Sequence, residues 1–360
     1  MVGFKVNKMN APKLDRRENN YPVIYDRRKN RENSSTIEVA KDRRLHMLIT
    51  VMGQMSDYLI NPLITDIILN PDQMLWVEKI GEGRIKTDIK ISESNAASII
   101  KLIATQTDQG EISKTNPIIS TEIPGCGYRF EGVMPPITET PSFCIRKSAT
   151  TIFSLEDYLK KNILTKEEVK YIKNCVKNYK NIMIAGGTGS GKSTLANAIL
   201  QEIATYQDRL IIIEDTRELK CDIENITYMK SNDHIDMTRL LKSAMRQDPD
   251  RIVVGEVRGS EALALLKAWN TGHPGGITTL HANNAINALT RLEQLILEGI
   301  NTPQHKLIAE SVDVVIYIKK INSKQRKVTE IIEINDYVEN KYQVRIPLKK
   351  VKPLRRKEKK

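Results

Sequence analysis

The sequence predicts an α/β protein in which a smaller α+β domain precedes a larger domain with a mostly parallel sheet. Three observations support this fold class. From residue 181 to 345, apolar strand-like runs alternate with helical stretches, which is typical of a parallel sheet. Residues 45–148 instead combine helices with several short strands. A glycine-rich loop at 186–193 follows the first strand of the later region and opens a helix.

The chain has 360 residues, which is enough for two domains of ordinary size. We expect five segments along it. They are a charged, flexible arm at 1–44, an N-terminal α+β domain at 45–148, a linker or helical connector at 149–180, the parallel-sheet domain at 181–345 and a basic tail at 346–360.

Apolar spacing predicts the elements of the N-terminal domain. Leucine and methionine recur at helical spacing from Leu45, and this helix should end near Pro62. Turn-forming residues separate the runs that follow it. The pattern predicts strands at 65–70, 74–80 and 84–91, a helix at about 94–107, and strands at 116–123, 128–134 and 143–148.

Two capping boxes mark helix starts in the connector. Ser154 with Asp157, and Thr165 with Glu168, have the spacing at which each side chain caps the other's backbone N–H.

From residue 181, strand-like and helical runs alternate, which predicts the parallel-sheet domain. Its expected elements are strands at 181–186, 209–215, 225–230, 251–256, 276–282 and 313–321, helices at 192–205, 236–246, 259–271 and 284–298, a hairpin over 317–334 and a strand near 341–347.

Composition excludes several classes of protein. Aromatic residues make up only 5%, which argues against a base-stacking surface for single strands. No run of 18 apolar residues exists, and the first residues lack the apolar core of a signal peptide. The four cysteines form no C-x-x-C pair, so we expect no zinc site and a reducing compartment. These features predict a soluble intracellular protein.

The net charge of +12 lies at the two ends of the chain. Residues 1–44 carry +6 and residues 345–360 carry +8, which leaves −2 for the 300 residues between them. The basic ends have three open interpretations: solvated tails that aid solubility, attraction to an anionic membrane surface, and contact with DNA. The near-neutral body disfavours direct nucleic-acid binding by the core.

A phosphate-binding loop is the most specific motif in the chain. It matches G-x-x-x-x-G-K-[ST] between a strand and a helix, the context that the motif requires. Lys192 would reach the β and γ phosphates, and the Ser193 hydroxyl would bind Mg²⁺ with support from Thr194. The alternative is a glycine-rich turn that matches by chance. The predicted nucleotide-binding residues are Gly186, Gly187, Thr188, Gly189, Ser190, Gly191, Lys192, Ser193 and Thr194.

Carboxylates follow two of the predicted strands. Glu256 ends the run RIVVGE, where a Walker B strand should end, and is the candidate to polarise the attacking water. Gly255 replaces the usual acid before it. Glu214 and Asp215 end another run and could hold Mg²⁺ through water or orient the nucleophile. The structural alternatives are a surface glutamate at a strand end and a solvated acidic loop.

Two of the five histidines lie in one segment near the end of the predicted sheet. The strand ITTL delivers His281 to the sheet edge, where it could sense the γ-phosphate or bridge it to Glu256. His273 precedes the same strand. The alternative is a structural histidine, and zinc is disfavoured because no cysteine accompanies the pair at ligand spacing.

Four motifs, in this order, resemble those of the secretion traffic ATPases. GGTGSGKST, IIEDTREL, RIVVGEVRG and TGHPGGITTLHANN match the Walker A motif, Asp box, Walker B motif and His box of that family. The family includes motors of type II secretion, type IV pili and type IV secretion, and the match covers about 45–345. The stretch 247–284 looks most like the TrbB-like conjugal transfer ATPases. The absence of a tetracysteine zinc module argues against the pilus-assembly and type II branches.

The resemblance implies a RecA-like ATPase domain preceded by a PAS-like domain, a hexameric ring, and nucleotide bound between the two domains. In this family, arginines of the N-terminal domain approach the phosphates, and the matching residues are Arg129 and Arg146. Each could instead form a surface ion pair. Arg217 is a weaker candidate. Three more arginines near Walker B could serve subunit contacts: Arg246, Arg251 and Arg258.

We therefore expect a cytoplasmic ATPase that rests peripherally on the inner membrane and, with inner-membrane components, drives a type IV secretion or conjugative DNA transfer system. Its cofactors would be ATP and Mg²⁺. Its catalytic residues would be Lys192, Glu256, Glu214, His281 and the two N-terminal arginines. A type IV pilus retraction ATPase, which also lacks the tetracysteine module, is the rival within the family. A RecA-like DNA helicase and a nucleotide-binding scaffold without turnover are the alternatives from other classes.

Overall fold

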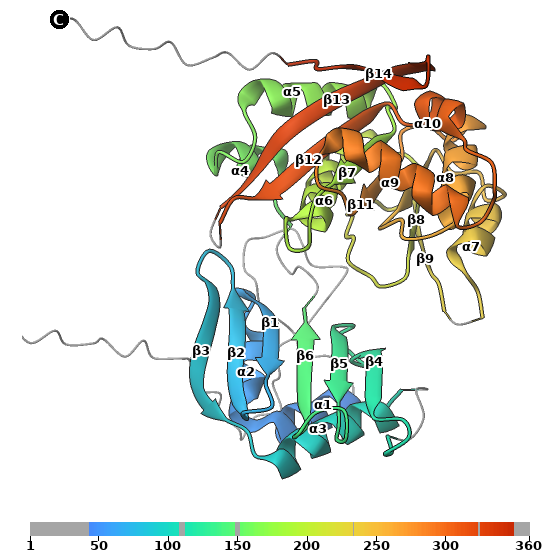
Figure 1. The fold of residues 1–360 in the computed structure, drawn as a ribbon. Helices are drawn as coiled ribbons and strands as arrows, with labels where there is room; N and C mark the ends of the chain where they lie inside the picture. The colour runs from blue at the N-terminus through green and yellow to red at the C-terminus, as the bar shows by residue number, and fades with distance from the viewer. Residues whose placement is uncertain (1–42, 108–111, 148–151, 233, 323–324, 349–360) are drawn as a thin grey trace, which may run out of the picture. The chain divides into compact units, whose positions relative to one another are not determined.

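The computed structural model describes residues 43–107, 112–147, 152–232, 234–322 and 325–348. Within these ranges the chain divides into two compact units. The first contains most of a six-stranded sheet, and the second contains an eight-stranded sheet (Figure 1). The charged arm and the basic tail that the sequence predicts lie almost entirely outside the described residues.

The N-terminal region has the helices and short strands that its apolar spacing predicts. The expected first helix begins as predicted but is interrupted at Gly53, whose φ of +55° is in the left-handed region. The sheet order is β3-β2-β1-β6-β5-β4. The elements are α1 (Arg43–Met52), η1 (Gly53–Met55), α2 (Ser56–Ile60), β1 (Ile64–Leu69), β2 (Met74–Lys79), β3 (Gly83–Lys90), α3 (Glu93–Thr105), β4 (Ile118–Glu122), β5 (Arg129–Val133) and β6 (Ser142–Arg146).

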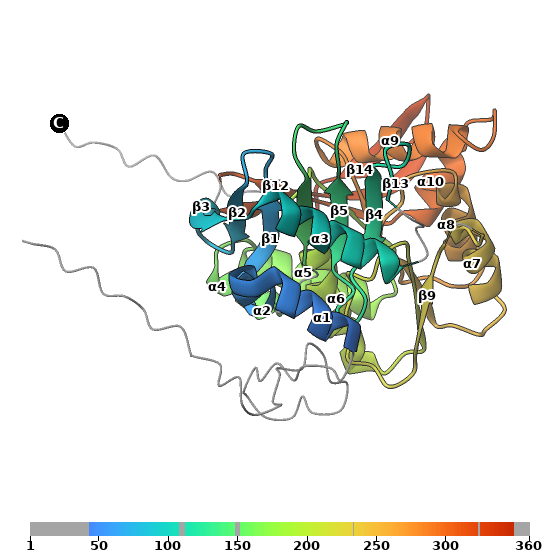
Figure 2. The same cartoon turned by 90° about the horizontal axis from the view of Figure 1, so that it is seen from below.

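Helices α1 and α3 lie side by side in both views of the fold (Figures 1 and 2). Helix α3 packs against β5, because a Cβ atom added to Gly132 would lie only 3.1 Å from Ile100 Cγ2. Glycine therefore lets this helix approach the sheet closely. The buried residues of α3 recur at helical spacing and form its core-facing stripe: Ala96, Ile99, Ile100, Ile103 and Ala104.

The eight-stranded sheet has the order β14-β13-β12-β7-β11-β10-β8-β9. Each of the strands from β12 to β9 is parallel to its neighbour, whereas β13 and β14 pair antiparallel at one edge. The strands are β7 (Ile182–Ala185), β8 (Leu210–Glu214), β9 (Ile226–Lys230), β10 (Arg251–Val254), β11 (Ile277–Leu280), β12 (Val314–Lys320), β13 (Arg326–Val338) and β14 (Lys341–Arg345).

Helices cover both faces of this sheet, since the central strands are buried on both sides. In β7, Ile182 and Ile184 join one apolar cluster, while Met183 and Ala185 join the other. This alternation follows from the two-residue period of a strand. The helices are α4 (Leu155–Lys160), α5 (Lys166–Lys177), α6 (Lys192–Ile203), α7 (Met237–Ala244), α8 (Glu261–Asn270), α9 (Ala285–Leu297) and α10 (His305–Ser311), with the short η2 (Ala204–Tyr206).

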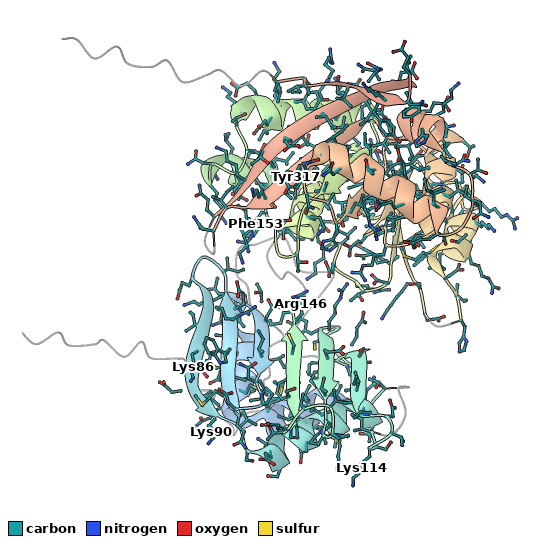
Figure 3. The ribbon with its side chains drawn as sticks, in the orientation of Figure 1. Lys86, Lys90, Lys114, Arg146, Phe153 and Tyr317 are labelled. Atoms are coloured by element: carbon teal, nitrogen blue, oxygen red, sulfur yellow. The ribbon has the colours of Figure 1, made fainter. Side chains whose placement is uncertain are left out.

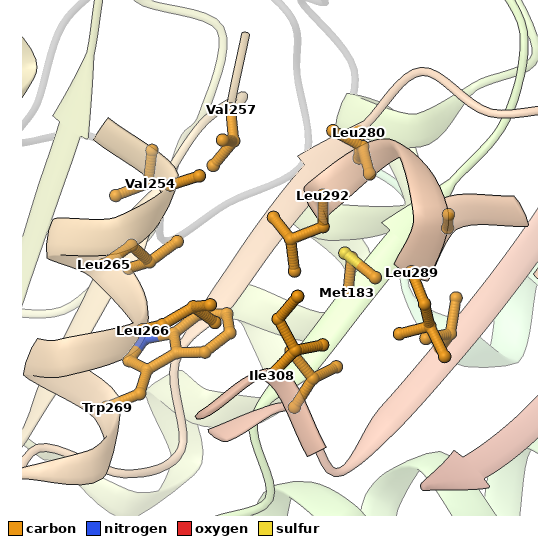
Figure 4. Packing of buried hydrophobic residues seen from close by; sticks show 14 of the residues in the cluster. Met183, Val254, Val257, Leu265, Leu266, Trp269, Leu280, Leu289, Leu292 and Ile308 are labelled. Atoms are coloured by element: carbon orange, nitrogen blue, oxygen red, sulfur yellow. The ribbon is translucent and has the colours of Figure 1, made fainter. Parts of the chain in front are cut away.

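The two clusters divide the helices between the two faces. One contains side chains of α4, α5 and α6, and the other contains side chains of α7, α8, α9 and α10. Figure 4 shows the second cluster, in which Trp269 of α8 and Ile308 of α10 lie near Met183 of the sheet. The Trp269 indole N–H donates to the carbonyl of Ile252, at 3.1 Å, so its polar atom is satisfied in the core.

The connector helices begin where the capping boxes predict. Ser154 and Asp157 cap α4 reciprocally, and Thr165 and Glu168 do the same for α5. Both helices contribute to the cluster that also contains β7 and α6. The sequence did not predict α10, a seven-residue helix without a side-chain cap. None of the described helices is long and apolar enough to cross a bilayer.

Candidate functional site

Four adjacent strands end at the same edge of the eight-stranded sheet, and each has a predicted site residue at its end or just after it. The strands β7, β11, β10 and β8 are parallel neighbours, so their carboxyl ends meet. The phosphate loop follows β7 and His281 follows β11. Glu256 follows β10 after one glycine, and Glu214 is the last residue of β8. The sheet therefore gathers residues that lie up to 95 positions apart in the chain.

The phosphate loop has the curled backbone that its glycines permit. Gly189 and Gly191 have φ values of +68° and +98°, which L side chains rarely adopt. Gly191 is the residue from which α6 begins. A Cβ atom on Gly186 would lie 2.4 Å from the carbonyl oxygen of Ile318, so only glycine fits there. The loop thus places successive N–H groups and a helix N-terminus where phosphate oxygens can bind.

Lys192 is a buried cation with loosely held hydrogen bonds. The residue is only 8% exposed, and its Nζ atom is 3.4 Å from the carbonyl oxygen of Gly187. The same atom is 3.3 Å from both ring nitrogens of His281. Burial lowers the pKa of Lys192, while the carboxylate of Glu256 opposes that shift. A polyphosphate would supply the strong anionic partner that this ammonium lacks.

Glu256 lies between a histidine and an arginine, and the arginine donates hydrogen bonds to it. His281 Nε2 is 3.0 Å from Oε1 of Glu256. Arg258 Nε donates to Oε2 at 2.8 Å, and its Nη1 donates to Asp215 Oδ2 at 2.6 Å. Burial, and then the charge of Lys192, lower the pKa of His281, so its ring is neutral near pH 7. The predicted proximity of His281 to Glu256 is present in the structure.

Glu214 is the most deeply buried acid of the group, at 3% exposure. Its Oε1 accepts hydrogen bonds from the backbone N–H groups of Glu218 and Leu219, both at 3.0 Å, whereas Oε2 is buried and has no hydrogen-bond partner among the described residues. Burial raises the pKa of Glu214 to about 7. The carboxylate fills the space beside Gly255, where an added Cβ would lie 2.9 Å from Oε1. The missing side chain at 255 therefore makes room for Glu214.

The structure adds Glu218, which sequence reasoning did not single out. Its Oε2 accepts a hydrogen bond of 2.7 Å from the Ser193 hydroxyl, the group predicted to bind Mg²⁺. Its backbone carbonyl accepts a hydrogen bond from Asn197 Nδ2, at 3.2 Å, which ties the segment to α6. The only available signal was a third acid inside the segment IIEDTREL.

These oxygens fit a Mg²⁺ ion that is bound together with a phosphate chain. Mg²⁺ keeps several waters and takes one or two carboxylates beside substrate phosphates. The Ser193 hydroxyl, the Glu218 carboxylate and Oε2 of Glu214 are oxygens that can bind such an ion directly or through its water ligands. Among the described residues, no three His, Cys, Asp or Glu side chains form a metal cage by themselves.

Two other residues from the sequence analysis, His273 and Arg251, lie at the amino ends of β11 and β10, opposite this edge. His273 precedes β11, and its Nδ1 lies 3.0 Å from the carbonyl oxygen of Pro249. Arg251 has 0% exposure and is bonded to Asp208, so the idea that it serves a subunit contact is wrong. Arg217 lies over the ring of Tyr228 at 5.5 Å. Arg246 is exposed on the loop before β10, as a contact residue would be.

The two N-terminal arginines form a cross-strand pair in the other sheet. Arg129 is the first residue of β5, and Arg146, which is labelled in Figure 3, is the last residue of β6. The register of the two strands places these residues directly opposite each other. Arg146 is exposed and Arg129 is partly buried. The N-terminal unit thus presents two guanidinium groups at one position of its sheet.

Comparison with known proteins gives the family. The family model described as type II/IV secretion system protein matches residues 57–350. The conjugal transfer protein TrbB of Rhizobium radiobacter is 46% identical over 282 residues, covering 78% of this chain and 86% of that protein. The probable conjugal transfer protein TrbB of Sinorhizobium fredii is 44% identical over 283 residues, with the same coverage.

A solved structure supports the fold independently. The ATPase DotB of Legionella pneumophila has a TM-score of 0.56 and 22% identity, covering 81% of this chain and 80% of that one. The resemblance expected from the four motifs is therefore confirmed over both regions of the chain. On this evidence, the chain belongs to the type II/IV secretion system protein family, among relatives of the TrbB conjugal transfer proteins.

Proposed function

We propose that this protein is the ATP-hydrolysing motor of a type IV secretion or conjugative DNA transfer system. The observation that carries this proposal is the contact series from Lys192 through His281 to Glu256 beside the phosphate loop. It combines a phosphate-binding cation, a neutral histidine and a carboxylate, which are the parts needed to position a triphosphate and its attacking water. The TrbB relatives support the assignment to conjugative transfer.

Binding begins at the loop. Its N–H groups and the N-terminus of α6 receive the phosphate oxygens. Lys192 Nζ exchanges its long contacts with Gly187 and His281 for the β and γ phosphates. Because this ammonium is already buried, it loses little water when the phosphates arrive, and its attraction to them is strong. The triphosphate therefore binds with its terminal phosphate toward His281 and Glu256.

Ser193 would bind Mg²⁺ directly, and Glu218 and Glu214 would hold its water ligands. The ion, when bound, neutralises charge on the β and γ phosphates. Glu218 accepts the hydrogen bond of the Ser193 hydroxyl, which fixes the direction of that hydroxyl. Glu214 is anchored by two backbone N–H groups, which fix the direction of its remaining oxygen.

Glu256 would orient the attacking water and accept its proton. Arg258 holds one carboxylate oxygen of Glu256 and His281 lies against the other. This arrangement fixes the carboxylate in one orientation, which lowers the entropy cost of placing the water. The neutral ring of His281 has a single N–H, which it would donate either to Glu256 or, once the nucleotide is bound, to the γ-phosphate.

The assembly is also part of the proposal. We place the protein in a homohexameric ring at the cytoplasmic surface of the inner membrane, where it acts with the inner-membrane components of the machine. Arg129 and Arg146 of the N-terminal domain would bring their paired guanidinium groups to the nucleotide phosphates. Hydrolysis would then change the contact between the two domains and so produce movement.

The test is Mg²⁺-dependent phosphate release by the purified full-length protein. We expect Glu256→Gln to reduce turnover about 10³-fold while ATP affinity changes less than threefold, because it removes the base and keeps the binding groups. Lys192→Ala should abolish both binding and turnover. The matched control is Glu224→Gln, which neutralises an exposed acid outside the site.

Two results would overturn the proposal. The first is full turnover by Glu256→Gln. The second is a wild-type protein that binds ATP but releases no phosphate, even with anionic vesicles and partner proteins. Tight, salt-sensitive binding of single-stranded DNA with DNA-stimulated hydrolysis would favour the helicase alternative instead.

A further inference from the structure

The β12–β13 hairpin forms the outer wall of the phosphate loop. Its backbone touches the start of the loop, since the carbonyl oxygen of Ile318 leaves no room for a side chain on Gly186. Further along, Arg326 Nε donates a hydrogen bond of 3.2 Å to the carbonyl oxygen of Gly189. The Cδ atom of Arg326 also lies 3.4 Å from the position of a Cβ atom on Gly191. One arginine, 137 residues away in sequence, thus lies against two glycines of the loop.

The order of the strands shows which end of the nucleotide faces this arginine. His281 and Glu256, which mark the γ-phosphate end, follow β11 and β10, on one side of β7. The β12–β13 hairpin lies on the other side of β7. A nucleotide whose phosphates curl around the loop therefore leaves its ribose and base on the side of the hairpin. Arg326 lies on that side.

The guanidinium of Arg326 has N–H donors that make no hydrogen bond within the described residues. Its side chain is partly exposed, and Nε makes the one hydrogen bond that the described residues provide to its guanidinium. Both terminal nitrogens therefore have donors for a ligand. A guanidinium plane stacks on a nucleobase and also donates hydrogen bonds to ribose hydroxyls. These are the groups that a nucleoside brings to this position.

We propose that Arg326 contacts the nucleoside part of the bound nucleotide, with Nε anchored on Gly189 and the rest of the guanidinium against the ribose and base. This inference rests on the proposed function of the loop. Stacking accepts any base, so Arg326 contributes affinity for ATP and GTP alike. The anchored Nε fixes the plane, which reduces the entropy lost when the nucleoside binds.

The experiment compares two ligands that differ only by the nucleoside. ATP and inorganic tripolyphosphate each displace a fluorescent ADP analogue from the full-length protein carrying Glu256→Gln, which prevents turnover. We expect Arg326→Ala to weaken ATP about tenfold and to leave the inhibition constant of tripolyphosphate within twofold. GTP should weaken as much as ATP. Arg326→Gln, which retains a donor for Gly189, repeats the measurement if the alanine variant unfolds.

Controls separate this inference from the proposed function. Lys327→Ala removes the same charge from the next, exposed position of β13 and should change neither affinity more than twofold. Lys192→Ala should weaken both ligands at least a hundredfold. If Arg326→Ala weakens both ligands equally, or neither, the nucleoside contact is wrong while the loop assignment survives. If Lys192→Ala leaves both affinities intact, the proposed function fails first.

Discussion

The two edges of the eight-stranded sheet differ in how well their buried charged side chains are hydrogen-bonded within the protein. At the amino ends of the strands, the guanidinium of Arg251 is fully buried, and each of its three nitrogens donates a hydrogen bond. At the carboxyl ends, Lys192 is buried with long hydrogen bonds, and one oxygen of Glu214 has no hydrogen-bond partner in the described part of the chain. The same sheet thus has one edge where the buried Arg251 is bonded within the protein, and another where Lys192 and Glu214 keep hydrogen-bonding capacity for a ligand.

At the amino-end edge, the buried guanidinium of Arg251 has hydrogen-bond partners on several segments of the chain. Arg251 Nε donates to Asp208 Oδ2 at 2.5 Å, and its terminal nitrogens donate to the carbonyl oxygens of Gly275 and Val176. The Tyr179 ring lies 3.9 Å from the guanidinium carbon, and its hydroxyl donates to Asp208 at 2.9 Å. This cluster joins the segments that precede β7, β8, β10 and β11, so it stabilises the sheet and offers no group to a substrate.

The contrast gives a general criterion for this fold. Desolvating a charge costs several kcal/mol, and only strong partners offset that cost. Where the protein supplies the partners, the charge adds to specificity of the fold. Where the protein does not supply them, the buried charge lacks strong partners, and polyphosphate and Mg²⁺ can provide them. Three substitutions test whether the two edges differ in this way.

The largest effect is expected at the amino-end edge. Arg251→Ala leaves Asp208 buried without its cation, so the free energy of unfolding should fall by about 3–5 kcal/mol. Urea unfolding of the full-length protein, followed by circular dichroism, measures this. Arg246→Ala, which removes an exposed arginine nearby, should change stability by less than about 0.5 kcal/mol. ATP affinity below the unfolding transition should stay within twofold, and a large loss would contradict the division of roles.

The second effect concerns pH and Glu214. Its folded-state pKa of about 7 lies above the ordinary value of 4.5, so the unfolded chain binds fewer protons between these values. The contribution of this group is fully present below pH 4.5 and is lost as pH rises to 7. Glu214→Gln should therefore match the wild type near pH 4.5 and exceed its stability at pH 8 by about 2–3 kcal/mol.

The measurement is urea unfolding of the ligand-free protein at both pH values. Glu224→Gln serves as the control because it changes the same chemical group at an exposed position. Equal stability of wild type and Glu214→Gln at pH 8 would show that the buried carboxylate already has a partner. It would then weaken the contrast between the edges.

The smallest effects come from a matched pair of histidines at opposite ends of β11. His281→Ala should lower ATP turnover about 10- to 100-fold, because it removes the ring that contacts both Lys192 and Glu256. His273→Ala removes one hydrogen bond to Pro249 and should cost about 1 kcal/mol of stability. Its turnover should stay within twofold. Equal turnover in the two variants would remove His281 from the mechanism.

Local chemistry explains which features the sequence alone predicts. Both capping boxes join residues three positions apart, so no distant segment can alter them. The phosphate loop is also local, since its fold depends on glycine backbones between one strand and one helix. By contrast, α10 lacks a side-chain cap and spans two turns, which is too short for a periodic signal.

The composition of the site divides in the same way. The sequence by itself determines the phosphate loop, the carboxylates and histidine that end the parallel strands, and the location of the net charge at the chain ends. Only the tertiary structure decided which of these groups meet. The bond from Glu218 to Ser193 spans 25 residues, that from Arg326 to Gly189 spans 137, and the burial of Arg251 depends on four segments at once. Such contacts follow from strand order and packing, which no local pattern of residues encodes.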